Sequence, residues 1–325
     1  MFQQSLQSRG FSQRVAATMA LSRRQSSSKL YSTYLRQWTL FCRARHRDPF
    51  RASVAEALDF LQSLIDDDNV HRGYSTIATA RSALSSVIIL DSGTPFGSHP
   101  DVIRFMKGVY NMRPPTTRYT ITWDTSVVVE FLKHWGPAQK LSLEKLTLKT
   151  VVLILLVSGR RGQVLPALTL DNMRLSDDDV TFYLQNSELK EGRLGHKGGA
   201  IKLKAFTGNK RLCVHHYILH YLKRTVKIRQ GLRPLFLTVK KPHHPPSRDT
   251  FSRWVKTVLQ LAGIDTAMFA PGSTRAAASS KAAFNGATLD QIMEGGGWSR
   301  PSTFTKFYKK PIKKQKKAFG DFVLK

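Results

Sequence analysis

The chain has 325 residues, which is long enough for two domains with a core each, and 41% of them are hydrophobic, as in globular proteins. The 51 Lys and Arg residues outnumber the 22 Asp and Glu residues, and the formal net charge of +29 predicts a polyanionic partner, with nucleic acid as the first candidate. A membrane partner is disfavoured, because the sequence has no apolar run of about 18 residues.

The cysteines and histidines do not predict a metal site. Cys42 and Cys213 are far apart, and their spacing fits neither a zinc site nor a disulfide framework, so we expect a reducing compartment. His215, His216 and His220 cluster without cysteine or carboxylate companions at ligand spacing. We interpret them as helix-surface or core residues.

The first third of the chain is predicted to be helical. Residues 1–25 are polar and rich in Ser, Gln and Arg, which predicts a flexible basic arm. Residues 26–111 carry apolar residues at helical spacing and are predicted to form a helical DNA-binding domain. Arg36 and Arg43 lie on the polar side of its first helix or at its end, and we take them as candidate DNA contacts. The predicted helices begin near Ser28, Ser53 (with Glu56 at capping-box spacing), Ser75 and His99.

Residues 112–122 (MRPPTTRYTIT) are predicted to be a linker, because two prolines disfavour a helix and favour extended backbone. Arg113 and Arg118 keep this stretch basic and are further candidate DNA contacts.

A second domain is predicted over residues 123–311, with Asp124 as the N-cap of its first helix. The apolar helix from Leu146 to Val157 is expected to be buried on most sides. It runs into Ser158-Gly159-Arg160-Arg161, where two adjacent arginines require an anion or an acid nearby. An interaction with the carbonyls at the helix end is the alternative that these residues leave open.

A basic hairpin is predicted next. A short helix over 165–170 is followed by strands over 177–184 and 201–206, around a turn-rich segment. Lys190 lies at the strand end, and the segment adds Arg193, His196 and Lys197, which would suit a DNA groove. The predicted fold is therefore mainly α with a small β-hairpin or sheet.

Helices are then predicted over 213–226, 250–262, 275–283 and 289–293. A Gly-rich turn ends in Trp298, and Tyr308 follows among lysines, in a context that indicates an exposed phenol close to phosphate rather than a core residue. A generally basic surface is the alternative. The tail, residues 312–325, combines a basic run with an apolar end that we expect to dock on a partner. The basic run is also a weak nuclear-import or DNA-contact signal.

Five residues occur in an order that resembles the tyrosine recombinases, a phage-integrase-like family: Arg161, Lys190, Arg275 (in Ser-Thr-Arg), Trp298 and Tyr308. The resemblance is closer to the recombinases of DIRS-type and Ngaro-type eukaryotic retroelements. It covers the chain from about Ser26 to Pro311, through the phrases FMKGVYNMRPP (105–115), LLVSGRRGQVLPALTL (155–170), STRAAASSKA (273–282) and GWSRPSTFTKFY (297–308).

The resemblance implies a helical core-binding domain followed by a mixed α/β catalytic domain. It implies an enzyme that cleaves and rejoins double-stranded DNA through a 3′-phosphotyrosine intermediate, in a tetrameric synaptic complex. Integration of a mobile element, a nuclear location and the absence of any cofactor are further implications.

The same resemblance assigns roles to the five residues. Tyr308 would attack the phosphodiester, and Arg161 and Arg275 would bind the non-bridging oxygens of the transition state. Lys190, or Lys197 if the strand register differs, would protonate the leaving 5′-oxygen. Trp298 would donate its indole N–H to a phosphate oxygen or pack beside the tyrosine.

Two departures from the family pattern put the activity in question. Gly272 stands where the family has the histidine of His-x-x-Arg, and loss of an acid-base group typically costs about 10²–10⁴-fold in rate. His196, His243 or His244 could fill that space. Val164 replaces an acidic residue, with Gln163 as a possible substitute. A sequence-specific DNA-binding protein with a degenerate site is therefore the alternative function, and a type IB topoisomerase is a less favoured one.

The adjacent arginines also leave a one-residue ambiguity in the motif. We choose Arg161 over Arg160, because its spacing fits Ser-Gly-x-Arg.

Overall fold

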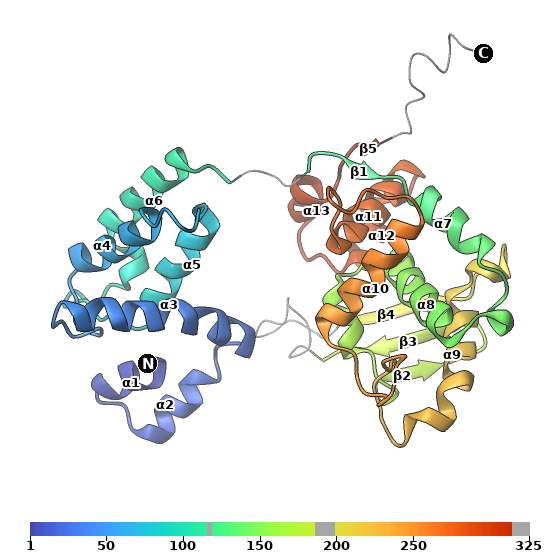
Figure 1. Cartoon of the computed structure of the whole chain (residues 1–325), viewed down its shortest axis with the longest axis horizontal. Coiled ribbons are helices and arrows are strands. Elements are labelled where there is room, and N and C mark those ends of the chain that lie inside the picture. Colours follow the sequence, from blue (N-terminus) through green and yellow to red (C-terminus); the bar gives the residue numbers. More distant parts are fainter. Residues whose placement is uncertain (116–118, 186–198, 314–325) are drawn as a thin grey trace, which may run out of the picture. The chain divides into compact units, whose positions relative to one another are not determined.

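A computed structural model of the chain describes residues 1–115, 119–185 and 199–313. The chain divides into two compact units, Met1–Thr117 and Arg118–Lys325, and each has its own buried core (Figure 1). The division falls inside the stretch that we expected to be a linker.

The described part of the first unit is helical, as its apolar periodicity predicted. Trp38 is fully buried at its centre, where its ring lies edge-on to Phe60 with the centroids 5.3 Å apart. The capping box of Ser53 and Glu56 is present. The elements are α1 (Phe2–Ser8), α2 (Gln13–Ala20), α3 (Gln25–Ala44), α4 (Val54–Ile65), α5 (Tyr74–Leu84), η1 (Phe96–Ser98) and α6 (Pro100–Met112).

The structure corrects the flexible arm expected over residues 1–25, which form α1 and α2 instead. Leu6 is only 2% exposed, and the Ser5 hydroxyl donates a hydrogen bond to the carbonyl of Val87 at 2.7 Å. The sequence analysis missed this because the apolar residues of the segment are weakly patterned, and the hydrogen bond that fixes Ser5 is to a residue 82 positions away.

The second unit is built around α8, whose residues from Leu146 to Leu155 are all buried. This helix packs against α9, α10 and α11 (Figure 1), and Arg160 and Arg161 follow its C-cap, Gly159. The elements are β1 (Thr122–Trp123), α7 (Thr125–His134), η2 (Ala138–Lys140), α8 (Leu143–Ser158), η3 (Gly162–Ala167), β2 (Met173–Leu175), β3 (Asp179–Tyr183), β4 (Ala200–Lys204), η4 (Lys210–Leu212), α9 (Val214–Arg229), α10 (Arg248–Leu261), η5 (Pro271–Ser273), α11 (Thr274–Phe284), α12 (Leu289–Gly296), α13 (Pro301–Phe307) and β5 (Ile312–Lys313).

Two small sheets complete this unit. Strands β2, β3 and β4 form an antiparallel sheet in which Phe182 pairs with Ile201 and Val180 with Leu203, so that these side chains share the buried face. The short strand β5 runs parallel to β1, with Ile312 opposite Thr122. The prediction of a mainly α fold with a small sheet is confirmed, while β2 was not predicted.

Two short elements differ from the predictions for reasons of local chemistry. The helix expected over 165–170 is a 3₁₀ helix over 162–167, because Pro166 has no N–H to continue an α-helix. Helix α13, which was not predicted, begins with Pro301 at its first position, where the missing N–H costs nothing.

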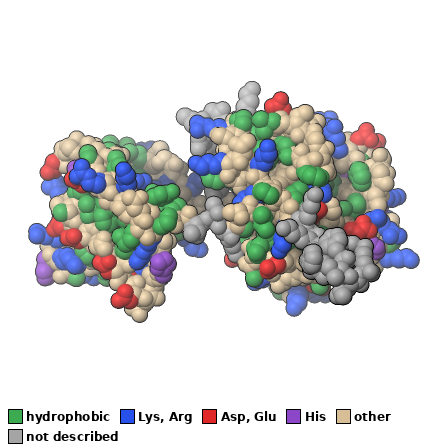
Figure 2. Space-filling view, turned by 90° about the horizontal axis from the view of Figure 1, so that it is seen from above, with side chains coloured by type: hydrophobic (Ala, Val, Ile, Leu, Met, Phe, Trp, Pro, Cys, Tyr) green, Lys and Arg blue, Asp and Glu red, His purple; other side chains and the backbone are tan. Residues whose placement is uncertain are grey.

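Within the described ranges, no helix is long and apolar enough to cross a bilayer, and no group of three or more His, Cys, Asp or Glu side chains could hold a metal ion. Cys42 and Cys213 are buried free thiols. Of the clustered histidines on α9, His215 contacts the carbonyl of Ser176, and the rings of His216 and His220 pack on each other. Lys and Arg side chains are spread over the face of each unit that Figure 2 shows, among hydrophobic and uncharged ones.

Candidate active site

Arg275, the second residue of α11, is held in a fixed orientation by two backbone carbonyls. Its Nη1 donates to the carbonyl of Gly159 at 3.0 Å and to that of Gly296 at 2.7 Å, and the side chain is only 3% exposed. Nε and Nη2 are buried and make no hydrogen bond to the described residues. Burial, and then the nearby Arg161 guanidinium, lowers the pKa of Arg275 to about 10, so the group stays charged at neutral pH. Two N–H-bearing nitrogens of a buried cation are therefore available for an anion.

The glycines around Arg275 are required by their backbone conformation or by close contacts. Gly159 ends α8 and Gly297 ends α12, both with positive φ (58° and 67°), which glycine adopts without strain. A Cβ at Gly296 would lie 2.0 Å from the Trp298 ring, and one at Gly297 would lie 1.6 Å from Nη1 of Arg160. The Gly-rich turn therefore lets an indole and a guanidinium lie directly on the backbone.

Of the two adjacent arginines, the structure places Arg161 beside Arg275. Nη2 of Arg161 donates to the phenol oxygen of Tyr308 at 3.4 Å. Arg160 turns the other way, and its Nη2 donates to the carbonyls of Ala200 in β4 and Glu294 in α12 at 3.3 and 3.2 Å. Arg160 thus links the sheet to α12, a role that its sequence position did not reveal.

Tyr308 ends α13 and is half-buried, which corrects the exposed tyrosine that its lysine neighbours indicated. Its ring packs on that of Trp298, with the centroids 5.1 Å apart. The Ser280 hydroxyl of α11 donates to the carbonyl of Tyr308 at 2.9 Å and accepts from the backbone N–H of Lys310 at 3.0 Å. Ser280 therefore fixes the backbone on the C-terminal side of the tyrosine.

One cavity of about 300 Å³ lies beside these groups. Arg161, Arg275 and Tyr308 lie on its wall together with Arg248, which the sequence analysis did not single out. None of the described residues that line it is acidic. A cavity with three guanidinium groups and no carboxylate is a site for an anion.

The structure shows what surrounds Gly272 and Val164, the two residues that depart from the family pattern. Gly272 lines the cavity, and a Cβ there would meet nothing within 4 Å. His243 and His244 do not fill that space, because their Nδ1 atoms contact the carbonyls of Thr238 and Pro245 away from the cavity. His196 lies outside the described residues. Val164 is buried, and Gln163 lines the cavity.

Trp298 contributes packing to the site. The Arg275 guanidinium carbon lies 3.9 Å from the centre of its ring and 5.0 Å from that of Tyr308, and the contact between the two rings completes a cluster of three side chains. Its indole nitrogen is buried without a hydrogen-bond partner among the described residues, and the residue does not line the cavity. The expected donation to a phosphate oxygen has no geometric support in this structure.

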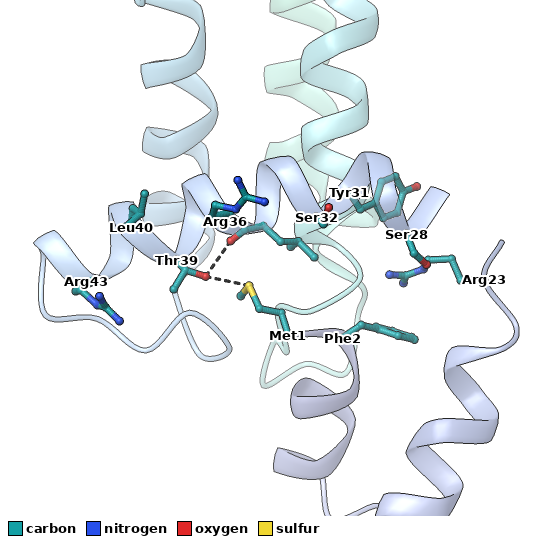
Figure 3. Close-up of a pocket in the computed structure, with 11 residues that line it drawn as sticks. Met1, Phe2, Arg23, Ser28, Tyr31, Ser32, Arg36, Thr39, Leu40 and Arg43 are labelled. Carbon is teal, nitrogen blue, oxygen red and sulfur yellow. Dashed lines mark hydrogen bonds between the residues drawn. The ribbon is translucent and has the colours of Figure 1, made fainter. Parts of the chain in front are cut away.

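The predicted DNA contacts fall into three groups. Arg36 and Arg43 are exposed on α3, along a cavity of about 440 Å³ beside α1 (Figure 3). Arg113 donates instead to the carbonyls of Arg72 and Ile65, at 2.9 and 3.1 Å. Its positive charge therefore lies against the carbonyls at the C-terminal end of α4. The last group lies outside the described residues: Arg118, Lys190, Arg193 and Lys197.

The signals that sequence reasoning missed are of two kinds. Ser247 caps α10, and the pattern Ser-Arg-Asp-Thr could have placed Arg248 at a helix start, but not in this cavity. Ser280 lies in a run of small residues and has no local signal, because its two partners are about thirty residues away.

Comparisons with known proteins identify the family and the fold. Residues 126–314 match the model of the phage integrase family. The fold is similar to that of the XerH site-specific recombinase bound to palindromic difH substrate in a post-cleavage complex, at 15% identity and a TM-score of 0.52, over 79% of this chain and 70% of that one. The pre-cleavage complex of XerH with difH gives 14% identity and a TM-score of 0.50, over 79% and 67%. No curated protein sequence matches the chain significantly.

Proposed function

Because this chain belongs to the phage integrase family, we propose that it is a site-specific DNA recombinase in which Tyr308 cleaves and rejoins DNA strands through a 3′-phosphotyrosine intermediate. One observation carries the proposal: the Arg161 and Arg275 side chains, 114 positions apart in the sequence (275 − 161), line the same cavity as the Tyr308 side chain. The fold and the family support DNA cleavage as a class of activity, and the arrangement of these groups assigns the residues.

The arrangement suits phosphoryl transfer. The Tyr308 phenol gives its proton to water as its oxygen attacks the phosphorus, the P–O5′ bond breaks, and the 5′-oxygen leaves as a hydroxyl with a proton donated by Lys190. Negative charge gathers on the non-bridging oxygens in the transition state, where the free Nε and Nη2 of Arg275 and the Arg161 guanidinium bind it. The reverse attack by a 5′-hydroxyl rejoins a strand, so no external energy source is needed.

Lys190 is our proposed donor of the proton to the 5′-oxygen, and it lies outside the described residues. The strands that flank its segment support the assignment. Tyr183 at the end of β3 pairs with Ala200 at the start of β4, and Arg160 joins that same Ala200 to the end of α12. The base of the segment is therefore attached to the element that precedes Trp298.

Tyr308 is proposed to act in the site of its own chain. The pairing of β5 with β1 and the two hydrogen bonds of Ser280 hold the tyrosine and the residues after it on the same unit as both arginines. No second protomer is needed to complete this cluster.

We further propose that the reaction serves integration of a mobile element of the DIRS or Ngaro type, in the nucleus. The phrases that resemble those recombinases and the net charge of +29 support this role. Two recombining duplexes require four protomers, so a tetrameric synaptic complex on double-stranded DNA is part of the proposal. The apolar end of the tail, residues 312–325, is its proposed contact between protomers.

The alternative is a DNA-binding protein that has lost turnover. The open space at Gly272 is the observation that favours it, because no described histidine occupies that space. Trapping of a covalent adduct separates the two functions.

The test begins with footprinting of a duplex that the chain selects from a random-sequence library. A nick is then placed next to the cleavage position, so that the released fragment diffuses away and the adduct accumulates. The wild-type chain should become covalently attached to the 3′ end, and Tyr308→Phe should bind the same duplex without attachment. Binding by the wild type with no adduct would refute the recombinase and leave the DNA-binding alternative.

A further inference from the structure

We infer that Arg248 is a third phosphate-binding group of this site, and that its guanidinium contacts a non-bridging oxygen of the scissile phosphate on the side where Gly272 leaves open space. This role presupposes the strand cleavage proposed above. It adds to the site a residue that belongs to neither arginine motif of the sequence.

The position of Arg248 on its helix directs it toward the cavity. Arg248 is the first residue of α10, and it shares one face of that helix with Phe251, Ser252 and Val255, at spacings of three, four and seven. All four residues line the 300 Å³ cavity. The same helix packs against η3, which follows Arg161, and against η5, which contains Gly272. Because Phe251 and Val255 are buried in the core, the start of α10 is fixed relative to both turns.

The guanidinium of Arg248 has no partner among the described residues. Its side chain makes no hydrogen bond or ion pair with the residues that the structure describes, and it is exposed. Asp249 is the neighbouring acid, but adjacent residues on a helix point in different directions. All five N–H donors of the guanidinium are therefore available to a ligand.

The cavity needs such a ligand, because its cations have no counter-charge among the described lining residues. Arg161 already contributes to the lowered pKa of Arg275, which is the physical sign of repulsion between the two. A third guanidinium on the wall of the cavity adds to the attraction when a phosphodiester enters. The transition state, in which negative charge collects on the non-bridging oxygens, gains most.

Arg248 and a histidine at position 272 would differ in chemistry. A guanidinium binds an oxyanion through a planar pair of N–H groups and stays charged at all relevant pH values. An imidazole also transfers protons near neutral pH. Arg248 therefore supplies charge and orientation but not proton transfer.

The test compares Arg248→Ala with Arg253→Ala. Arg253 is an exposed arginine on the same helix that bonds Thr250 at 3.2 Å and does not line the cavity. Adduct formation is measured in single turnover at saturating protein on the nicked duplex. A second duplex carries a neutral methylphosphonate at the cleavage position, which removes the charged oxygen. Thermal melting verifies that each variant is folded.

On the phosphate duplex, Arg248→Ala should slow adduct formation by about 10²-fold, the loss typical of one transition-state donor. Arg253→Ala should keep the wild-type rate. On the methylphosphonate duplex, the loss caused by Arg248→Ala should shrink to a small factor, because the charge that Arg248 binds is absent. Arg248→Lys should recover part of the rate on the phosphate duplex, since it restores the charge without the planar fork.

A rate for Arg248→Ala equal to that of the wild type would overturn the role of Arg248 alone. An equal loss on both duplexes would also overturn it, because it would mean that the residue only shapes the site. If the wild-type chain forms no adduct at all, the recombinase function and the role of Arg248 fail together.

Discussion

Replacing Arg275 with lysine should damage catalysis and folding at once, because the guanidinium performs two tasks with different nitrogens. Nη1 binds the carbonyls of Gly159 and Gly296, while Nε and Nη2 are free for a phosphate. A lysine has one nitrogen at the end of its chain. If that nitrogen stays with the carbonyls, the phosphate loses its donor, and if it moves to the phosphate, two buried carbonyls lose theirs.

The two losses can be estimated separately. Loss of a preorganised donor to the transition state costs about 10²–10³-fold in the rate of the chemical step. Leaving buried carbonyls without a partner costs about 1–3 kcal/mol of stability. Arg275→Lys should therefore slow adduct formation on the nicked duplex by about 10²-fold or more, and it should lower the free energy of unfolding in urea by about 1–3 kcal/mol.

Arg161→Lys is the matched control. Arg161 is half-buried, and its hydrogen bond to the Tyr308 phenol is long at 3.4 Å, so the variant should lose rate with a smaller loss of stability. If Arg275→Lys keeps its cleavage rate within about tenfold of the wild type, the free nitrogens do not bind the transition state. Equal stability losses in the two variants would refute the carbonyl-binding task.

Three further predictions concern the rest of the chain. Gly297→Ala should destabilise the fold by about 2–4 kcal/mol in urea denaturation, because its Cβ displaces Arg160 as well as straining the backbone. Gly263 also has a positive φ but has open space around it, so Gly263→Ala should cost only about 1–2 kcal/mol. Equal costs for the two variants would contradict the clash with Arg160. Burial lowers the pKa of Lys149 to about 8 from 10.5, so the unfolded chain binds this proton more tightly than the folded chain does. The resulting destabilisation is fully present below about pH 8. The free energy of unfolding should therefore rise by up to about 3 kcal/mol between pH 8 and 10.5. Lys149→Met should abolish that rise in urea titrations, and the same rise in both proteins would refute it. Deleting residues 317–325 should preserve DNA binding by one protomer in native gels and weaken complexes of several protomers, and unchanged higher-order complexes would contradict the docking role of the tail.

Local patterns along the chain were enough to predict most elements of the fold. The capping box of Ser53 and Glu56, the N-cap at Asp124 and the buried helix α8 were all predicted, because each depends on residues within one or two helical turns. Two predictions of local structure failed. The pattern over residues 1–25 was too weak to predict α1 and α2, and Pro166 made the helix expected over 165–170 a 3₁₀ helix.

The order of Arg161, Arg275, Trp298 and Tyr308 was also readable from the chain, and so was the absence of a histidine at Gly272. Their relation in space was not, because it depends on contacts between separate elements, and those that bring the end of α8 and Arg161 to Arg275 and Tyr308 span more than a hundred residues. The tertiary structure decided that Arg161 rather than Arg160 faces Tyr308, since Arg160 is taken by the carbonyls of β4 and α12.

The sequence by itself determined which helices form and which chemical groups the chain carries, because periodicity, caps and residue types are properties of short stretches. Only the tertiary structure decided which cationic side chains share a cavity and which donate to backbone carbonyls instead. Arg113 and Arg248 show the difference. Arg113 was a predicted DNA contact, but its guanidinium binds carbonyls at the end of α4. Arg248 was not singled out, but it lines the same cavity as Arg161, Arg275 and Gly272.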